Sequence, residues 1–139
     1  MKCALKQMQE LDMHQKILAG TPFENKAILD ALGPLAEGVI YPYHFIANIT
    51  NPMISTYLEA FQKRFETHSG GFAPLMYDGV HIIAEALKKC EENTDCIATH
   101  LYQTSYQGIS GTMTFDKNGD PNLPIVMKTV HNGQFVQAE

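Results

Sequence analysis

The chain has 139 residues, 45% of them hydrophobic and 18% charged, which is enough for one soluble domain with a buried core. Its 10 basic and 15 acidic residues give a formal net charge of -5, and the scattered basic residues argue against a nucleic-acid-binding surface. No apolar run approaches the roughly 20 residues that cross a bilayer, and no signal peptide is expected because residues 1–16 lack its apolar stretch.

The first 45 residues predict an alternation of helices and strands. Apolar residues at helical spacing predict a helix over 3–13, and the stretch 16–20 is typical of a short buried strand. A second helix is predicted over 23–33 and a second strand over 37–45. This alternation is typical of an α/β fold, in which helices cover a parallel sheet.

Three more helices are predicted in the middle of the chain. The first runs to Thr67 and is capped by Thr50 or Asn51, and the others begin at Pro74 and Thr94. The helix from Pro74 is amphipathic, with one apolar face that comprises Met76, Val80, Ile83, Ala84 and Leu87.

The last part of the chain predicts strands and turns. The segments 112–115 and 124–130 are predicted to form a β-hairpin, and the Asn-Gly pair at 132–133 predicts a turn before a last short strand. Oxygen-bearing side chains alternate at 116, 118 and 120, as at the start of a calcium loop. The sixth and twelfth positions of such a loop would be Pro121 and Met127, so a tight turn is predicted instead.

Only two parallel strands are predicted for a chain with several helices. Such a small sheet leaves strand edges and apolar helix surface uncovered. Either the chain pairs with a second copy, so that we expect self-association, or it is part of a larger fold.

Enzymatic chemistry has little support in the sequence. The six histidines lack zinc-ligand spacing, and no nucleophile elbow or phosphate loop is present, so no metal and no cofactor are expected. His81 and Glu85 lie one helical turn apart, which favours a surface ion pair over a catalytic site. Aromatic residues at strand ends and helix starts can line a cleft. Tyr41 and Phe72 are such candidates, whereas Tyr77 is expected to pack in the core.

Cys90 and Cys96 lie in a short connection between two predicted helices. Their spacing is not that of a zinc or redox site, and it is compatible with a disulfide or with two unlinked thiols. Cys3 would be left over in either case.

The order of motifs resembles the second half of type I periplasmic solute-binding proteins of the branched-chain amino-acid-binding kind. The segment that carries "AGTPF" and "AEGV" comes first, followed by "YDGVHIIAEAL", "GISGTMTFDKNGDP" and "VHNGQFV". The resemblance implies a partial two-lobed α/β fold. Residues 1–45 would belong to the second lobe, 46–107 to the helical part of the first lobe, and 108–139 to a C-terminal hairpin and crossover segment.

The resemblance also implies a function and a location. The parent protein would be periplasmic and would deliver an amino acid or similar small polar solute to an ABC permease, without enzymatic activity. The acidic residue that meets the ligand's ammonium group in this family corresponds to Thr21, which carries no negative charge, and the aromatic pocket residue corresponds to Phe72. The oxidising periplasm favours the disulfide between Cys90 and Cys96. The alternative is a small sensor or interaction module on the same half-fold, without solute transport.

Overall fold

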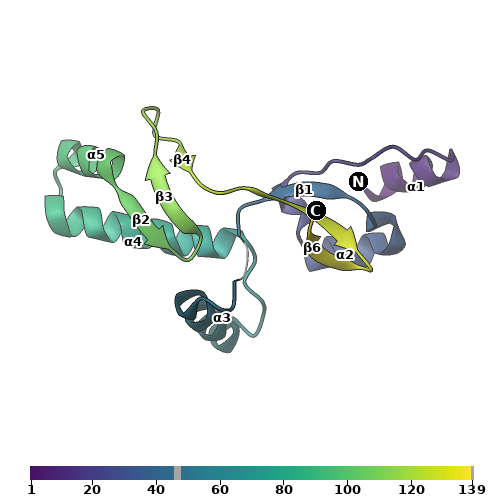
Figure 1. Cartoon of the computed structure of the whole chain (residues 1–139), viewed down its shortest axis with the longest axis horizontal. Coiled ribbons are helices and arrows are strands. Elements are labelled where there is room, and N and C mark those ends of the chain that lie inside the picture. The colour runs from purple at the N-terminus through teal and green to yellow at the C-terminus, as the bar shows by residue number, and fades with distance from the viewer. Residues whose placement is uncertain (46–47, 139) are drawn as a thin grey trace. The chain divides into compact units, whose positions relative to one another are not determined.

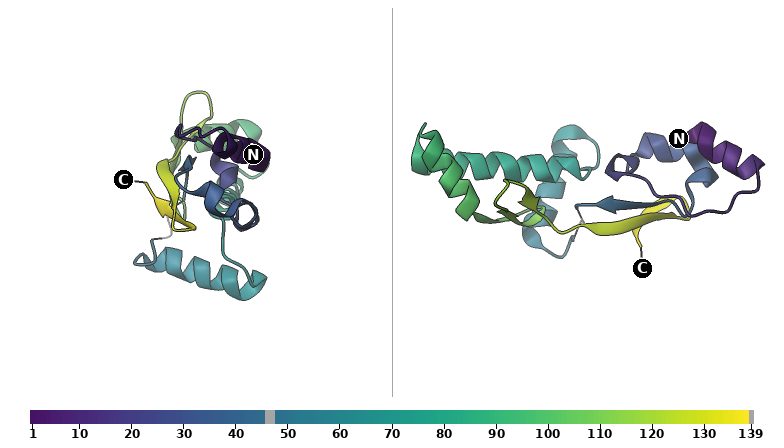
Figure 2. Two further views of the ribbon diagram at one scale, coloured as in Figure 1. Left: turned by 90° about the vertical axis from the view of Figure 1, so that its right-hand side faces the viewer. Right: turned by 90° about the horizontal axis from the view of Figure 1, so that it is seen from above.

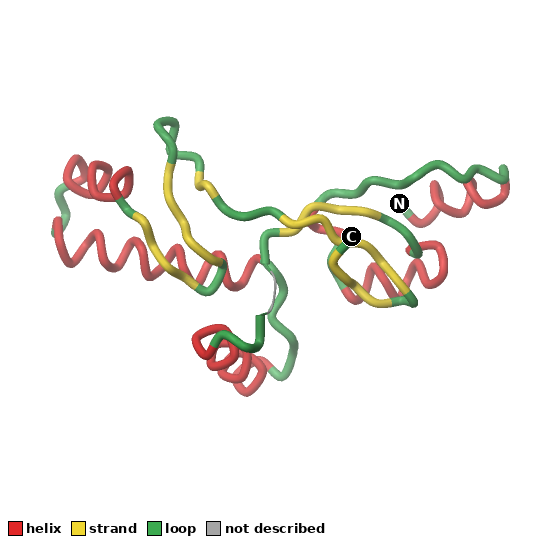
Figure 3. The backbone as a smooth tube through the Cα atoms, viewed as in Figure 1, coloured by secondary structure: helices red, strands yellow, loops and turns green. Residues whose placement is uncertain are grey.

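The computed structural model describes residues 1–45 and 48–138, and the chain divides into two compact units (Figures 1 and 3). Unit 1 combines Met1–Tyr43 with the C-terminal residues from Ile125, and unit 2 comprises His44–Pro124. The predicted segment 46–107 begins at residues that lie outside the described ones. The assignment of segments to the lobes of a parent protein stays a prediction.

Unit 1 holds a small antiparallel sheet of order β1-β5-β6 together with short helices. Its elements are α1 (Lys2–Glu10), the 3₁₀ helix η1 (Thr21–Phe23), α2 (Lys26–Leu32), the 3₁₀ helix η2 (Gly33–Ala36), β1 (Ile40–Tyr43), β5 (Val126–His131) and β6 (Gln134–Gln137). The strand predicted over 16–20 is reduced to a single parallel bridge between Leu18 and Ile40. The two segments therefore run parallel, as predicted, but they do not form a longer ladder.

Local sequence signals explain the ends of these elements. The Asn25 side chain accepts a hydrogen bond from the Ala27 N–H at 2.8 Å, which caps α2 at its start. Gly33 ends the same helix with a φ of 56°. The predicted Asn-Gly turn between β5 and β6 is confirmed, because Asn132 and Gly133 adopt φ values of 52° and 68°.

Unit 2 contains the three predicted helices and a second antiparallel sheet, of order β2-β3-β4. Its elements are α3 (Pro52–Phe65), α4 (Phe72–Cys90), α5 (Thr94–Gln103), β2 (Ser105–Gly108), β3 (Gly111–Phe115) and β4 (Pro121–Asn122). Of the two predicted capping residues, Asn51 caps the start of α3. No described helix is both long and apolar enough to cross a membrane.

The hairpin predicted between 112–115 and 124–130 is wrong. The first of these segments pairs with β2 and β4, and the second pairs with β1 and β6. A loop leads from β4 into β5, and this loop is where the chain passes from unit 2 back to unit 1 (Figure 3). The C-terminal hairpin exists, but its strands are β5 and β6. Strand alternation indicates which face of a strand is buried and does not indicate its partner.

Two contacts hold α4 against other elements of unit 2. Asp78 is 1% exposed, and its carboxylate accepts hydrogen bonds from the N–H groups of Ile109 (2.9 Å) and Ser110 (2.7 Å), in the turn between β2 and β3. At the other end of the helix, Cys90 and Cys96 form a disulfide to α5 with an S–S distance of 2.03 Å, so the pairing that the resemblance favoured is present.

The predicted turn at 116–120 is confirmed. Asp116 Oδ1 accepts hydrogen bonds from the N–H groups of Asn118 (2.8 Å) and Asp120 (2.9 Å), and Gly119 adopts a φ of 86°. The Asp116 carboxylate therefore closes the loop between β3 and β4 through backbone hydrogen bonds.

Candidate functional site

Each unit carries its own candidate surface, and the two are described separately. In unit 1 the surface begins with the loop after the parallel bridge, where the Ala19 N–H donates to the Ile40 carbonyl at 2.8 Å. Thr21 follows and opens η1, where its side chain is partly exposed. Thr21 thus lies at the end of the short extended segment, where the resemblance places it. Its role in solute binding stays a prediction.

A charged cluster lies next to this loop. The Glu24 carboxylate accepts hydrogen bonds from the Tyr41 hydroxyl (2.7 Å) and from Lys128 Nζ (2.7 Å to Oε1). The Lys128 and Glu24 side chains are only 15% and 17% exposed, so the ion pair is largely shielded from water. Lys128 Nζ also lies 4.6 Å from the centre of the Tyr43 ring, a cation–π contact.

Tyr41 is buried within unit 1. Its side chain has no exposed surface, and its ring packs 5.2 Å from the ring of Phe23. Burial is the main cause that raises the pKa of Tyr41 above its ordinary value, and the hydrogen bond to the Glu24 carboxylate raises it further. Tyr41 therefore stays protonated and donates to Glu24. The predicted contact between Tyr41 and a solute is not tested by this geometry and stays a prediction.

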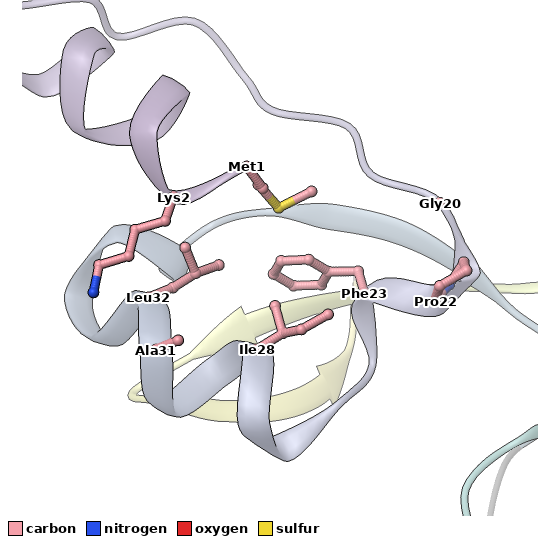
Figure 4. A pocket seen from close by; sticks show the side chains of 8 residues that line it. All are labelled: Met1, Lys2, Gly20, Pro22, Phe23, Ile28, Ala31 and Leu32. Carbon is pink, nitrogen blue, oxygen red and sulfur yellow. The ribbon is translucent and has the colours of Figure 1, made fainter.

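Unit 1 also carries a cavity of about 540 Å³ beside η1 and α2. Figure 4 shows the side chains of Met1, Phe23, Ile28 and Leu32 converging on it. Among the described residues that line the cavity, Lys2 carries the one charged side chain, and Figure 4 shows its amine directed away from Phe23. The cavity is mainly apolar, and we assign no chemistry to it.

In unit 2 the predicted aromatic residue is exposed. Phe72 is the first residue of α4, 54% of its surface is accessible, and its ring lies edge-on to the ring of His44 at 6.0 Å. An exposed ring beside a second aromatic group at a helix start can pack against the apolar part of a small solute.

A second aromatic group lines a cavity of about 520 Å³ between α3 and α4. Tyr77 lies 5.2 Å from Tyr57 and 4.6 Å from His81, measured between ring centres. Tyr77 is 45% exposed, so its predicted place in the core is wrong. The predicted ion pair of His81 with Glu85 is also wrong, because residues 1–45 and 48–138 show no such contact. The His81 ring instead packs against the Tyr77 ring at an angle of 50°.

Sequence reasoning missed Glu24 and Lys128. They are 104 positions apart, and neither residue belongs to a local pattern that predicts the pair. The one available signal was an acidic residue three positions after Thr21. The structure shows that this carboxylate is already bound by an ammonium group of the chain itself.

Comparison with known proteins identifies the fold. The chain matches the model of a family described as periplasmic binding protein over residues 3–134. The comparison with curated proteins found no match. Among solved structures, a leucine-binding protein of Thermotoga maritima superposes with a TM-score of 0.83 at 22% identity, over 98% of this chain and 40% of its own.

Two further solved structures are similar. An ABC transporter substrate-binding protein of Desulfitobacterium hafniense in complex with leucine gives a TM-score of 0.78 at 25% identity, over 97% of this chain and 39% of its own. The branched-chain amino acid transporter substrate-binding protein of Streptococcus pneumoniae, in complex with isoleucine, gives 0.78 at 19% identity, over 97% and 41%. The chain thus spans about 40% of the length of these structures.

These matches confirm the predicted α/β class and the predicted resemblance to periplasmic solute-binding proteins. Because the family model spans residues 3–134, the chain belongs to the periplasmic binding protein family, a family of solute-binding proteins.

Proposed function

We propose that the chain supplies the C-terminal part of an extracytoplasmic substrate-binding protein of an ABC transporter. The parent protein would bind an amino acid or a similar small polar solute between two lobes that close on it, and would present it to a permease in the periplasm. The observation that carries this proposal is the family match over residues 3–134, together with similarity to structures solved with leucine and isoleucine. The proposed role is binding and delivery, without catalysis.

The charges of unit 1 bear on the class of solute. Thr21 offers a hydroxyl group and no charge, and the nearby Glu24 carboxylate is neutralised by Lys128. A solute with an ammonium group would have to compete with Lys128 for Glu24, whereas an uncharged or carboxylate-bearing group can accept a hydrogen bond from Thr21. The proposed class therefore includes small polar acids without an ammonium group as well as amino acids.

The exposed Phe72 ring would supply the apolar contact from unit 2. A solute that touches only one or two such groups gains little, because each contact must offset the cost of fixing the solute. We therefore expect the chain alone to bind these solutes with a Kd weaker than about 1 mM.

Calorimetric titration of the whole chain with leucine, isoleucine, their 2-hydroxy analogues and benzoate tests this proposal. Weak saturable heat that is lost in Phe72→Ala is the expected result. Phe65→Ala is the matched control, because Phe65 is 55% exposed and Phe72 is 54% exposed. Micromolar binding would show that the chain holds a complete site, and absence of heat with every solute would contradict solute binding by these residues.

A further inference from the structure

The cavity between α3 and α4 in unit 2 has aromatic side chains from three elements in its wall. Tyr57 comes from α3, Tyr77 and His81 come from α4, and Tyr106 comes from β2. We call this cavity of about 520 Å³ the tyrosine pocket. Figure 2 shows α4, which supplies two of the four residues, as the long helix of unit 2. Phe72 is not among the described lining residues, so the tyrosine pocket is separate from the candidate solute contact.

Contacts between side chains hold these rings in place. The Tyr57 and Tyr77 rings lie 5.2 Å apart between their centres, with 62° between their planes, which is close to an edge-to-face pair. The Tyr57 hydroxyl lies within hydrogen-bond distance (3.0 Å) of Ser69 Oγ, and the Tyr77 ring also packs 4.6 Å from the His81 ring. The rings are therefore ordered before a ligand arrives, which lowers the entropic cost of binding.

The tyrosine pocket lies in a region of negative charge. Asp78 lies in its wall and is 1% exposed, and the carboxylate accepts hydrogen bonds from the N–H groups of Ile109 and Ser110, which are uncharged. Burial raises the pKa of Tyr106, and the nearby carboxylates of Asp78 and Glu85 raise it further. Within residues 1–45 and 48–138, neither carboxylate forms an ion pair and the wall contains no lysine or arginine. The described part of the chain therefore supplies no cation to balance this charge.

We propose that the tyrosine pocket binds a small organic cation that carries a methylated ammonium group. The faces of aromatic rings attract such a group through the ring quadrupole, and its methyl groups gain free energy by leaving water. A quaternary ammonium group has no N–H donor, so aromatic walls leave none of its hydrogen bonds unsatisfied. The carboxylates of Asp78 and Glu85 supply the complementary charge. This inference goes beyond the proposed function and does not depend on it.

Charge complementarity selects this occupant over others that fit the same space. A carboxylate-bearing solute would approach two carboxylates and would meet no lysine or arginine in the described wall, so it is disfavoured. An apolar segment from another part of the parent protein would fill the pocket but would leave the negative charge unmatched. The volume also suits a free solute, since small-molecule sites enclose about 300–1,000 Å³. The feature that distinguishes the proposed ligand is thus its positive charge.

Calorimetric titration of the whole chain with choline chloride tests the proposal, and 3,3-dimethyl-1-butanol is the matched control ligand. This alcohol has the shape of choline, with a carbon atom in place of the charged nitrogen. We expect a Kd on the order of 1 mM for choline and at least about tenfold weaker binding of the alcohol. The samples are held at about pH 8, where histidine side chains are ordinarily uncharged. Sodium chloride replaces choline chloride in the reference titration.

Two substitutions separate the contribution of the rings from that of the charge. Tyr77→Leu keeps apolar bulk but removes the ring, so it should weaken choline binding at least about fivefold. Tyr102→Leu is the matched control, because Tyr102 is 52% exposed and Tyr77 is 45% exposed, and Tyr102 lies outside the described wall. Glu85→Gln should weaken choline binding about twofold at low salt and should leave the weaker binding of the alcohol unchanged.

Three results would each overturn the proposal. The first is the absence of choline binding at concentrations up to about 50 mM. The second is equal affinity for choline and for the alcohol, because the pocket would then be only an apolar gap, of the kind that another part of a parent protein fills. The third is unchanged choline binding by Tyr77→Leu, with circular dichroism of the variant matching that of the wild type.

Discussion

The Asp78 carboxylate in α4 occupies the space that a side chain on Gly108 would need. An ideal Cβ at Gly108 would collide with all three terminal atoms of the Asp78 side chain, which is itself fixed by hydrogen bonds to Ile109 and Ser110. Two motifs that are about 30 residues apart in the sequence, "YDGV" and "GISG", are thus parts of one contact. The contact joins a helix to the turn between β2 and β3.

Gly108→Ala should destabilise unit 2. The added methyl group must displace a buried carboxylate and break one or both of its hydrogen bonds, which costs about 2–4 kcal/mol of unfolding free energy. Gly70→Ala is the control, because an added Cβ at Gly70 meets no atom within 4 Å. Urea unfolding followed by circular dichroism measures both variants, and equal stability of the two would contradict the account of Asp78.

Tyr41→Phe should lower the free energy of unfolding by about 2 kcal/mol at neutral pH, because a buried hydrogen bond to a carboxylate is lost. Burial and Glu24 raise the pKa of Tyr41, so the folded chain keeps the phenol proton at pH values where the unfolded chain loses it. The stability that Tyr41 contributes is therefore complete below about pH 10 and falls as the pH rises further.

Urea midpoints of the wild type and Tyr41→Phe between about pH 7 and 11 measure this effect. The difference between the two proteins should shrink above about pH 10. Tyr102→Phe, which alters a residue that is 52% exposed, should leave the wild-type pH profile unchanged. A difference that stays constant over the whole range would show that Tyr41 ionises normally in the folded chain.

Glu24 and Lys128 should be energetically coupled. Removing one partner leaves a largely buried charge, so Glu24→Gln and Lys128→Met should each lower the free energy of unfolding by about 2–3 kcal/mol. The double variant should lose about 1–2 kcal/mol less than the sum of the two single losses. The exposed pair Lys6 and Glu10, with side chains that are 68% and 62% exposed, is the control. Its coupling should be below about 0.5 kcal/mol. Strict additivity at Glu24 and Lys128 would contradict a shielded ion pair.

Reduction of the disulfide should lower stability modestly. Cys90 and Cys96 are six positions apart, and a loop of this size contributes about 2 kcal/mol by restricting the unfolded chain. Thermal unfolding with and without a phosphine reductant should show a lower midpoint in the reduced protein. The double variant Cys90→Ala, Cys96→Ala should unfold at that lower midpoint and should not respond to the reductant. An unchanged wild-type midpoint would contradict the contribution of this bond.

Local features of the sequence predicted much of the fold. The helices from Asn51, Pro74 and Thr94 and the turns at 116–120 and 132–133 were predicted because caps, prolines and Asn-Gly pairs act within a few residues. The partners of the strands were not predicted. Strand β5 pairs with β1, which lies some 90 residues earlier in the chain, and the alternation of apolar residues within a strand does not indicate such a distant partner.

The roles predicted for Thr21, Tyr41 and Phe72 stay predictions, and the sequence did not indicate the surroundings of these residues. Phe72 is exposed, whereas the burial of Tyr41 and the ion pair of Glu24 with Lys128 depend on the folded sheet. The pair joins the loop after Thr21 to β5, and no pattern within either segment indicates the other. A long-range contact between single residues leaves no periodic signal in one sequence.

The most direct test of the central claim is an NMR titration of the ¹⁵N-labelled chain with leucine, its 2-hydroxy analogue and benzoate at millimolar concentrations. The account predicts that a bound solute shifts the amide signals of 20–24 in unit 1 or of 71–73 in unit 2, and that Phe72→Ala abolishes the shifts in unit 2 while Phe65→Ala does not. Shifts confined to other residues, or no shifts with any of these solutes, would contradict the assignment of the candidate site.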